Sequence, residues 1–171
     1  MGLAVMLTML LAQATPSASP LPSNVFNGAT TTLTLAAALD RLIADAVNNF
    51  ATDHGAKAVS SRFVTGYTLN FRIEGLTDCA IVATDVSFAM CTAYRGKDSA
   101  AARSAYDALK ARLRGFAGRT EPIDETVTTA KSATLTTATY RPNDKTEVMI
   151  EMVEGEGSAA VVLTVKPIWS L

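Results

Sequence analysis

The stretch from Cys79 to Tyr94, CAIVATDVSFAMCTAY, holds two apolar runs on either side of Asp85. Short apolar runs that contain β-branched residues and flank a polar turn are typical of a β-hairpin. In a hairpin centred on Asp85, the only two cysteines of the chain, Cys79 and Cys91, lie directly opposite each other. Redox cysteines usually lie two residues apart at a helix start, a spacing that this pair lacks. We therefore predict a structural disulfide across the hairpin.

Further strands are predicted on both sides of this hairpin. Apolar and polar residues alternate from Tyr67 to Glu74, which indicates a strand with one buried face. After the hairpin, four segments rich in Thr and Val are predicted strands, namely 126–130, 133–140, 147–153 and 159–165. We expect the Thr-rich segment 133–140 at the edge of the sheet, where it could pair with a second copy of the chain to form a homodimer.

Two amphipathic helices are predicted between these strands. From Leu35 to Phe50, apolar residues recur at steps of three and four, and Gly55 is expected to mark the stop. A second helix opens at Asp98 or Ser99, since both residues cap helix N-termini well.

The second helix is expected to end at Gly115 or Gly118. Leu109 lies on its apolar stripe and is expected to be buried against the sheet. Lys110, one residue further on, is expected on the opposite, solvated face.

These elements follow the order α-βββ-α-βββ(β). Helices and antiparallel strands in this order predict an α+β fold, in which two helices pack on an antiparallel β-sheet that carries one disulfide. We expect residues 34–171 to form a single α+β domain, because 171 residues suit one core. The order also suggests a duplicated αβββ unit, although no repeat is evident in the residues themselves.

The N-terminal residues predict export. Gly2 to Ala12 is apolar and uncharged but too short to span a bilayer, and the small residues of Ala12-Gln13-Ala14 follow it. We predict a signal peptide at 1–14, cleavage before Thr15, and a flexible Pro/Ser/Thr-rich tether at 15–33. The mature chain is then periplasmic or secreted, with no integral membrane segment.

Few residues suggest catalysis. The only histidine, His54, excludes a His-rich metal site, and we expect it to cap the first helix or lie neutral on the surface. The carboxylate pairs Asp124-Glu125 and Glu154/Glu156 are expected to be solvated charges at strand ends and turns. No catalytic residue, metal site or cofactor is predicted.

Charge is distributed unevenly along the chain, although the net charge is only −1. Seven basic and two acidic residues lie between Arg95 and Arg119, whereas eight acidic and four basic residues follow from Glu121 onward. The second helix could therefore face an anion or a protein partner, and the candidate residues are Lys97, Arg103, Lys110 and Arg114. The alternative is a solvated helix face whose cations favour the helix C-terminus. No aromatic residues interleave the cations, so we expect no nucleic-acid partner.

The sequence favours an exported, non-enzymatic protein that binds another protein or an envelope component through its sheet or its basic helix. The alternative is a small hydrolase with a His-independent Asp or Ser centre. Such a centre would show as a concave pocket with perturbed carboxylates.

Overall fold

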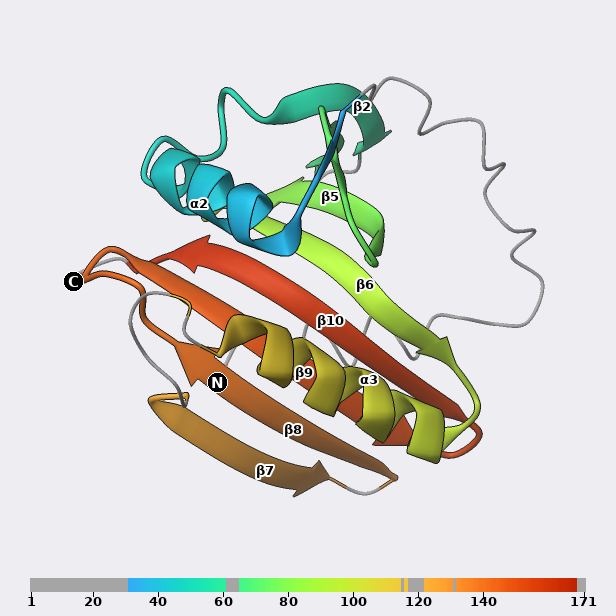
Figure 1. The fold of residues 1–171 in the computed structure, drawn as a ribbon. Helices are drawn as coiled ribbons and strands as arrows, with labels where there is room; N and C mark the ends of the chain where they lie inside the picture. The colour runs from blue at the N-terminus through green and yellow to red at the C-terminus, as the bar shows by residue number, and fades with distance from the viewer. Residues whose placement is uncertain (1–30, 61–64, 115, 117–121, 131, 169–171) are drawn as a thin grey trace.

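The structure is a computed structural model that describes residues 31–60, 65–114, 116, 122–130 and 132–168. The predicted signal peptide, most of the tether, and the glycines expected to end the second helix lie outside these residues. The described chain forms two helices and a large antiparallel sheet with one disulfide, as predicted, and the helices cross one face of the sheet (Figure 1).

The main sheet has eight strands, and every neighbouring pair is antiparallel. From one edge to the other the strands are β2 (His54–Ser60), β3 (Thr65–Leu69), β5 (Thr77–Ala83), β6 (Phe88–Gly96), β10 (Ser158–Pro167), β9 (Thr146–Gly155), β8 (Ala133–Tyr140) and β7 (Asp124–Ala130). A separate parallel pair joins β1 (Thr32–Leu33) to β4 (Arg72–Ile73).

The main sheet consists of two halves with the same element order. The helix α2 (Leu35–Ala46) precedes β2, β3, β5 and β6, and α3 (Ser99–Leu113) precedes β7, β8, β9 and β10. In each half the chain runs from an outer strand to the centre, where β6 and β10 pair. The helix α2 packs on β10, while α3 packs across β6, β9 and β10.

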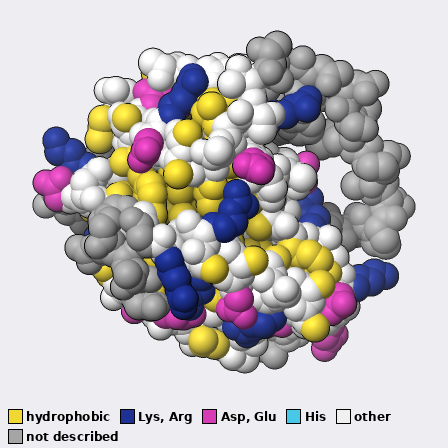
Figure 2. Space-filling model, in the orientation of Figure 1, with side chains coloured by type: hydrophobic (Ala, Val, Ile, Leu, Met, Phe, Trp, Pro, Cys, Tyr) yellow, Lys and Arg dark blue, Asp and Glu magenta, His cyan; other side chains and the backbone are white. Residues whose placement is uncertain are grey.

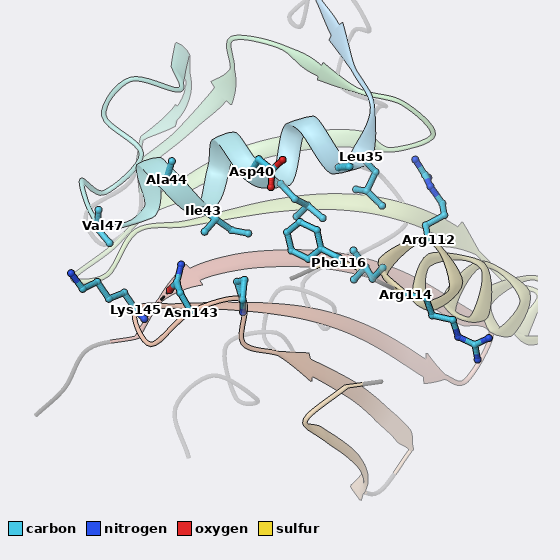
Figure 3. Close-up of a pocket in the computed structure, with 14 residues that line it drawn as sticks. Leu35, Asp40, Ile43, Ala44, Val47, Arg112, Arg114, Phe116, Asn143 and Lys145 are labelled. Carbon is cyan, nitrogen blue, oxygen red and sulfur yellow. Dashed lines mark hydrogen bonds between the residues drawn. The ribbon is translucent and has the colours of Figure 1, made fainter. Parts of the chain in front are cut away.

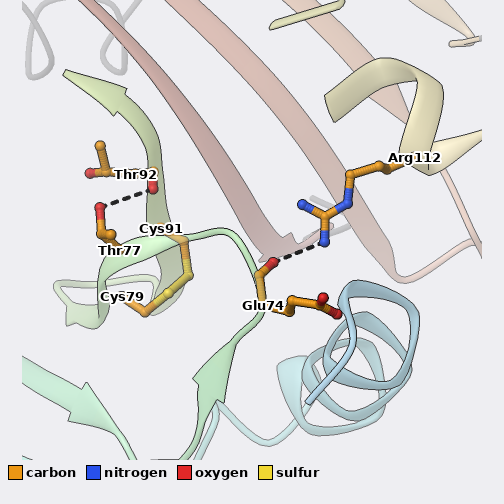
Figure 4. The surroundings of a disulfide bond; sticks show 6 residues. All are labelled: Glu74, Thr77, Cys79, Cys91, Thr92 and Arg112. Atoms are coloured by element: carbon orange, nitrogen blue, oxygen red, sulfur yellow. Dashed lines mark hydrogen bonds between the residues drawn. A yellow bond between two sulfur atoms is a disulfide. The ribbon is translucent and has the colours of Figure 1, made fainter. Parts of the chain in front are cut away.

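The hairpin β5–β6 has the register that the sequence predicts around Asp85. Ile81 lies opposite Ala89, and the pairing shifts near Asp78, which has a positive φ of 48°. Within this irregular stretch, Cys79 and Cys91 form the predicted disulfide, with their Cα atoms 4.1 Å apart (Figure 4).

The first helix ends earlier than its apolar pattern suggests. Thr34 caps α2, which stops at Ala46 because Asn49 and Phe50 adopt positive φ values of 56° and 58°. The carboxylate of Asp45 accepts the backbone N–H groups of the two residues that follow this turn, 52 and 53. The interpretation of Gly55 as the helix stop was wrong, since that glycine lies within strand β2.

The second helix begins where its cap predicts. The Asp98 carboxylate accepts the N–H groups of Ala100 and Ala101 at 2.8 and 3.1 Å. Leu109 is only 2% exposed, which confirms its place in the core. Because α3 lies across three central strands, its apolar stripe closes the core over the second half of the sheet.

Three strand predictions need correction. The strand β2 was missed altogether, so the predicted order lacks one strand after the first helix. The predicted strand 67–74 is divided, because the chain leaves the main sheet after Leu69 and β4 pairs with β1 instead. The segment 133–140 forms β8 with the predicted bounds, but it is an interior strand and β7 is the edge.

The core lies between the helices and the sheet. The side chains of Leu39 and Leu42 on α2, and of Ile150 and Leu163 on the central strands, are at most 2% exposed. Neither helix in the described part of the chain has the length and apolar character needed to cross a membrane.

Candidate binding groove

Two of the four predicted cations of the second helix bind acids of the sheet. The Lys110 ammonium lies 2.9 and 2.7 Å from the two carboxylate oxygens of Glu125 on β7, and the Tyr106 hydroxyl donates to the same carboxylate at 3.0 Å. The hydrogen bond from Lys110 lowers the pKa of Glu125. Burial raises the pKa of Tyr106, and so does the hydrogen bond from its hydroxyl to Glu125. The side chain of Lys110 is 22% exposed, so the expectation that it lies on a solvated face was wrong.

The guanidinium group of Arg103 lies 3.6 Å from the carboxylate of Glu154 on β9, and both side chains are partly exposed. The positive charge of α3 is therefore matched in part by the negative charge of the strands beneath it. Lys97 is exposed just before α3, and Arg114 follows the last helical residue. Since these two positions are separated by about 25 Å of helix, the four predicted cations do not form one patch.

A groove opens between α2, the C-terminal end of α3 and the β8–β9 turn (Figure 3). Its volume is ≈ 740 Å³. Along α2 it is lined by Leu35, Leu39, Ile43 and Val47, which follow one another at four-residue steps and so lie in one row on the helix surface. Phe116 points toward this row from the opposite side. We call these apolar side chains the floor of the groove.

Charged side chains line the groove beside this floor. Arg112 and Arg114 come from the end of α3, Lys145 comes from the β8–β9 turn, and Asp40 is the one carboxylate among the described residues of the groove. The Arg112 guanidinium donates to the backbone carbonyl of Glu74 at 2.9 Å (Figure 4). Figure 2 shows apolar side chains on this face, with Lys and Arg side chains beside them. The groove thus combines an apolar floor with a mainly cationic rim.

Sequence reasoning identified Arg114 but missed the groove itself. The sequence does contain a signal for the groove. The apolar residues of α2 cover a wider arc of the helix than the single stripe that packing on a sheet requires. Leu39 and Leu42 are buried in that stripe, and Leu39 also lies at the bottom of the groove, whereas Val47 is 48% exposed and lies outside the stripe. The contribution of Lys145 could not be predicted, because it depends on where the β8–β9 turn lies relative to α2.

A polar cluster around Arg41, in the middle of α2, joins this helix to the segments that flank β2 and β3. Arg41 donates to the buried carboxylate of Asp53 at 2.6 Å and to the side chain of Asn70 at 3.1 Å. Asn70 in turn donates to the backbone of Thr52 at 2.8 Å. Burial raises the pKa of Asp53, although the ion pair with Arg41 opposes this shift. The contacts are all internal, which is typical of a structural cluster.

His54 does not cap α2, because that helix ends eight residues earlier and His54 begins strand β2. Its ring stacks on Tyr67, with the ring centroids 4.2 Å apart and an angle of 8° between the planes. The Nε2 atom is buried and has no hydrogen-bond partner among the described atoms. The expectation of a capping histidine was therefore wrong.

The remaining buried carboxylate with a raised pKa is Glu151 on β9. Burial raises its pKa, and Thr164 donates to it at 3.3 Å. Neither Glu151 nor Asp53 lines the groove.

In the part of the chain that the structure describes, no three His, Cys, Asp or Glu side chains are grouped so that they could hold a metal ion. No protein-family model, curated protein or solved structure matches this chain.

Proposed function

We propose that this chain is an exported, non-enzymatic binding protein whose groove takes an anionic amphiphile of the cell envelope, with an apolar chain on the floor and a negatively charged head at the rim. The observation that carries the proposal is the apolar row of α2 beside three cationic side chains. Apolar pockets with a few placed polar groups are the usual form of small-molecule sites.

The dimensions of the groove support a ligand of this kind. A volume of ≈ 740 Å³ lies within the range that small-molecule sites occupy. The row from Leu35 to Val47 extends for about 18 Å along the helix. Leu35 and Leu39 are at most 5% exposed, so the accessible apolar surface of the row lies mainly at Ile43 and Val47. A chain laid along this row would remove apolar area from water on both surfaces, and each buried methylene group is worth about 0.8 kcal/mol.

The rim supports a negative rather than a positive head group. Arg112 and Arg114 lie at one end of the groove and Lys145 at the other (Figure 3), and together they outnumber Asp40, while Arg112 is held in place by its bond to the Glu74 carbonyl. A charge pair at 4 Å is worth about 1 kcal/mol in water and about 4 kcal/mol at a partly desolvated surface. The rim therefore favours an anion over a cation of the same shape.

The hydrolase alternative has less support. An Asp centre of the predicted hydrolase would show as a carboxyl group with a perturbed pKa inside a concave site. The carboxyl groups with raised pKa values, Asp53 and Glu151, lie outside the groove and are engaged by Arg41 and Thr164. This arrangement suits binding rather than acid–base chemistry.

Export is supported by the disulfide, since such bonds persist in oxidising compartments. Protein recovered from the cell envelope should begin at Thr15, as N-terminal sequencing can establish. Recovery of the uncleaved chain from the cytoplasm alone would refute the export proposal.

Fluorescence titration tests the ligand class. A fluorescent fatty acid should bind, whereas a fluorescent probe with the same chain and a quaternary ammonium head should bind at least tenfold more weakly. Val47→Asp, which places a carboxylate on the floor, and Lys145→Glu, which reverses a rim charge, should each weaken fatty-acid binding at least fivefold. Lys97→Glu reverses an exposed charge outside the groove and should leave binding unchanged.

Thermal melts of the three variants show whether each is folded. Equal binding of both head groups, or equal losses in all three variants, would refute the amphiphile proposal. If neither probe binds but an envelope protein cross-links to the groove and is lost with Val47→Asp, the groove serves a protein partner instead.

A further inference from the structure

The two edges of the main sheet differ in how they are protected from other strands. Edge strands expose unpaired backbone N–H and C=O groups, and natural proteins usually blunt such edges with bulges, lysines or prolines. The edge strand β2 follows this rule. Its pairing with β3 shifts register on both sides of Lys57, and the lysine itself lies on the edge strand.

The opposite edge, β7, has none of these features within the strand. Its seven residues pair with β8 in unbroken register, and all seven are exposed. From Thr126 to Ala130 the strand carries no charge and no proline. Val127 is 67% exposed and Ile123, just before the strand, is 38% exposed, so two of the three large apolar side chains that are exposed in the described chain lie at this edge.

From this contrast we infer that β7 is a self-association edge, which pairs antiparallel with β7 of a second copy about a two-fold axis at Val127. In this register Asp124 lies opposite Ala130 of the other copy, and Glu125 lies opposite Thr129. No like charges face each other, and the two Val127 side chains become direct cross-strand neighbours.

Charge excludes axes at the start of the strand, and among the remaining axes only the one at Val127 sets the two exposed valines opposite each other. An axis at Glu125 would set two carboxylates opposite each other, and an axis at Asp124 would do the same. Glu125 already forms an ion pair with Lys110 on the face of the sheet that carries the helices. Its negative charge is therefore neutralised within each copy before two β7 strands pair. The second copy thus extends one continuous antiparallel sheet across the axis.

The oligomeric state of the purified chain tests this inference. Light scattering after size exclusion, over a range of micromolar concentrations, should show a dimer. Val127→Lys puts a charge on the edge and should raise the dimer dissociation constant at least tenfold. The matched control is Ala58→Lys, which adds the same charge to the exposed middle of β2 and should leave the dimer intact.

Cross-linking tests the register without relying on a destabilised variant. Both native cysteines are bonded to each other, so an introduced cysteine has no native thiol as a partner. Val127→Cys should form a disulfide-linked dimer on oxidation, because residues on the axis face themselves at about 5 Å. Thr129→Cys lies on the same face but about 13 Å from its own copy in this register, and should not cross-link.

A chain that is monomeric at every concentration would overturn the inference. So would a dimer that Ala58→Lys disrupts and Val127→Lys does not. Cross-linking at 129 in place of 127 would overturn the proposed axis.

Discussion

Loss of the Cys79–Cys91 bond should lower the free energy of unfolding by about 3 kcal/mol. The bond joins residues 12 apart in sequence, and the loop-entropy model assigns roughly 3 kcal/mol to a ring of this size. For a fold of this length, a change of that magnitude lowers the melting temperature by roughly 10 °C. Denaturant melts of the oxidised and the reduced wild-type chain measure the cross-link alone, because both states keep the two sulfur atoms.

The double variant Cys79→Ala/Cys91→Ala adds a packing term to this loss. Cys91 is only 2% exposed, so removing its sulfur leaves a small cavity, which should cost about 1 kcal/mol more. The order of stability should be oxidised wild type, reduced wild type, double variant. Equal unfolding midpoints for the oxidised and reduced chains would refute the assignment of the bond as a stabilising cross-link.

Three further changes test the packing and charge assignments. Leu109→Ala should cost ~2 to 5 kcal/mol in denaturant melts, because it empties a buried site, and a loss below 1 kcal/mol would place the residue outside the core. A double-mutant cycle on Lys110 and Glu125 should give a coupling of at most ~1 kcal/mol, since Glu125 is more than a third exposed. The coupling should be complete above the ordinary glutamate pKa and vanish as pH falls through the lowered one, and a coupling that persists in acid would refute the ion pair. Glu151→Gln removes a buried carboxyl group whose pKa burial raises, and should stabilise the fold at neutral pH. That gain should shrink as pH falls through the raised pKa of Glu151 toward the ordinary value, and melts that show the same gain in acid would contradict it.

The parts of the fold that the sequence predicted well depend on local signals. The hairpin register follows from two apolar runs placed symmetrically about Asp85, and the start of α3 follows from the cap at Asp98. The bounds of β8 follow from a Thr-rich segment between Ala133 and Tyr140 that contains no charge, glycine or proline. In each case neighbouring residues carry enough information to specify the local structure.

The errors arose where distant contacts decide the structure. His54 and Gly55 look like a helix stop, yet they begin β2 because the turn held by Asp45 ends α2 earlier. The sequence shows that α3 is basic and the later strands acidic, but it cannot show that Lys110 lies above Glu125. The groove was missed for the same reason, since it exists only where α2, the end of α3 and the β8–β9 turn meet.

The pairing of β6 with β10 has a consequence for how the chain folds. β10 is the last of the described strands along the sequence, and it pairs with β9 on one side and β6 on the other. Until β10 is in place, β6 is an open edge and the first half of the sheet lacks the strand on which α2 packs. Contacts between such distant segments slow folding, because a long loop must close before they form. The N-terminal half must therefore wait for β10, and β6 is an open edge available for misassembly in that interval.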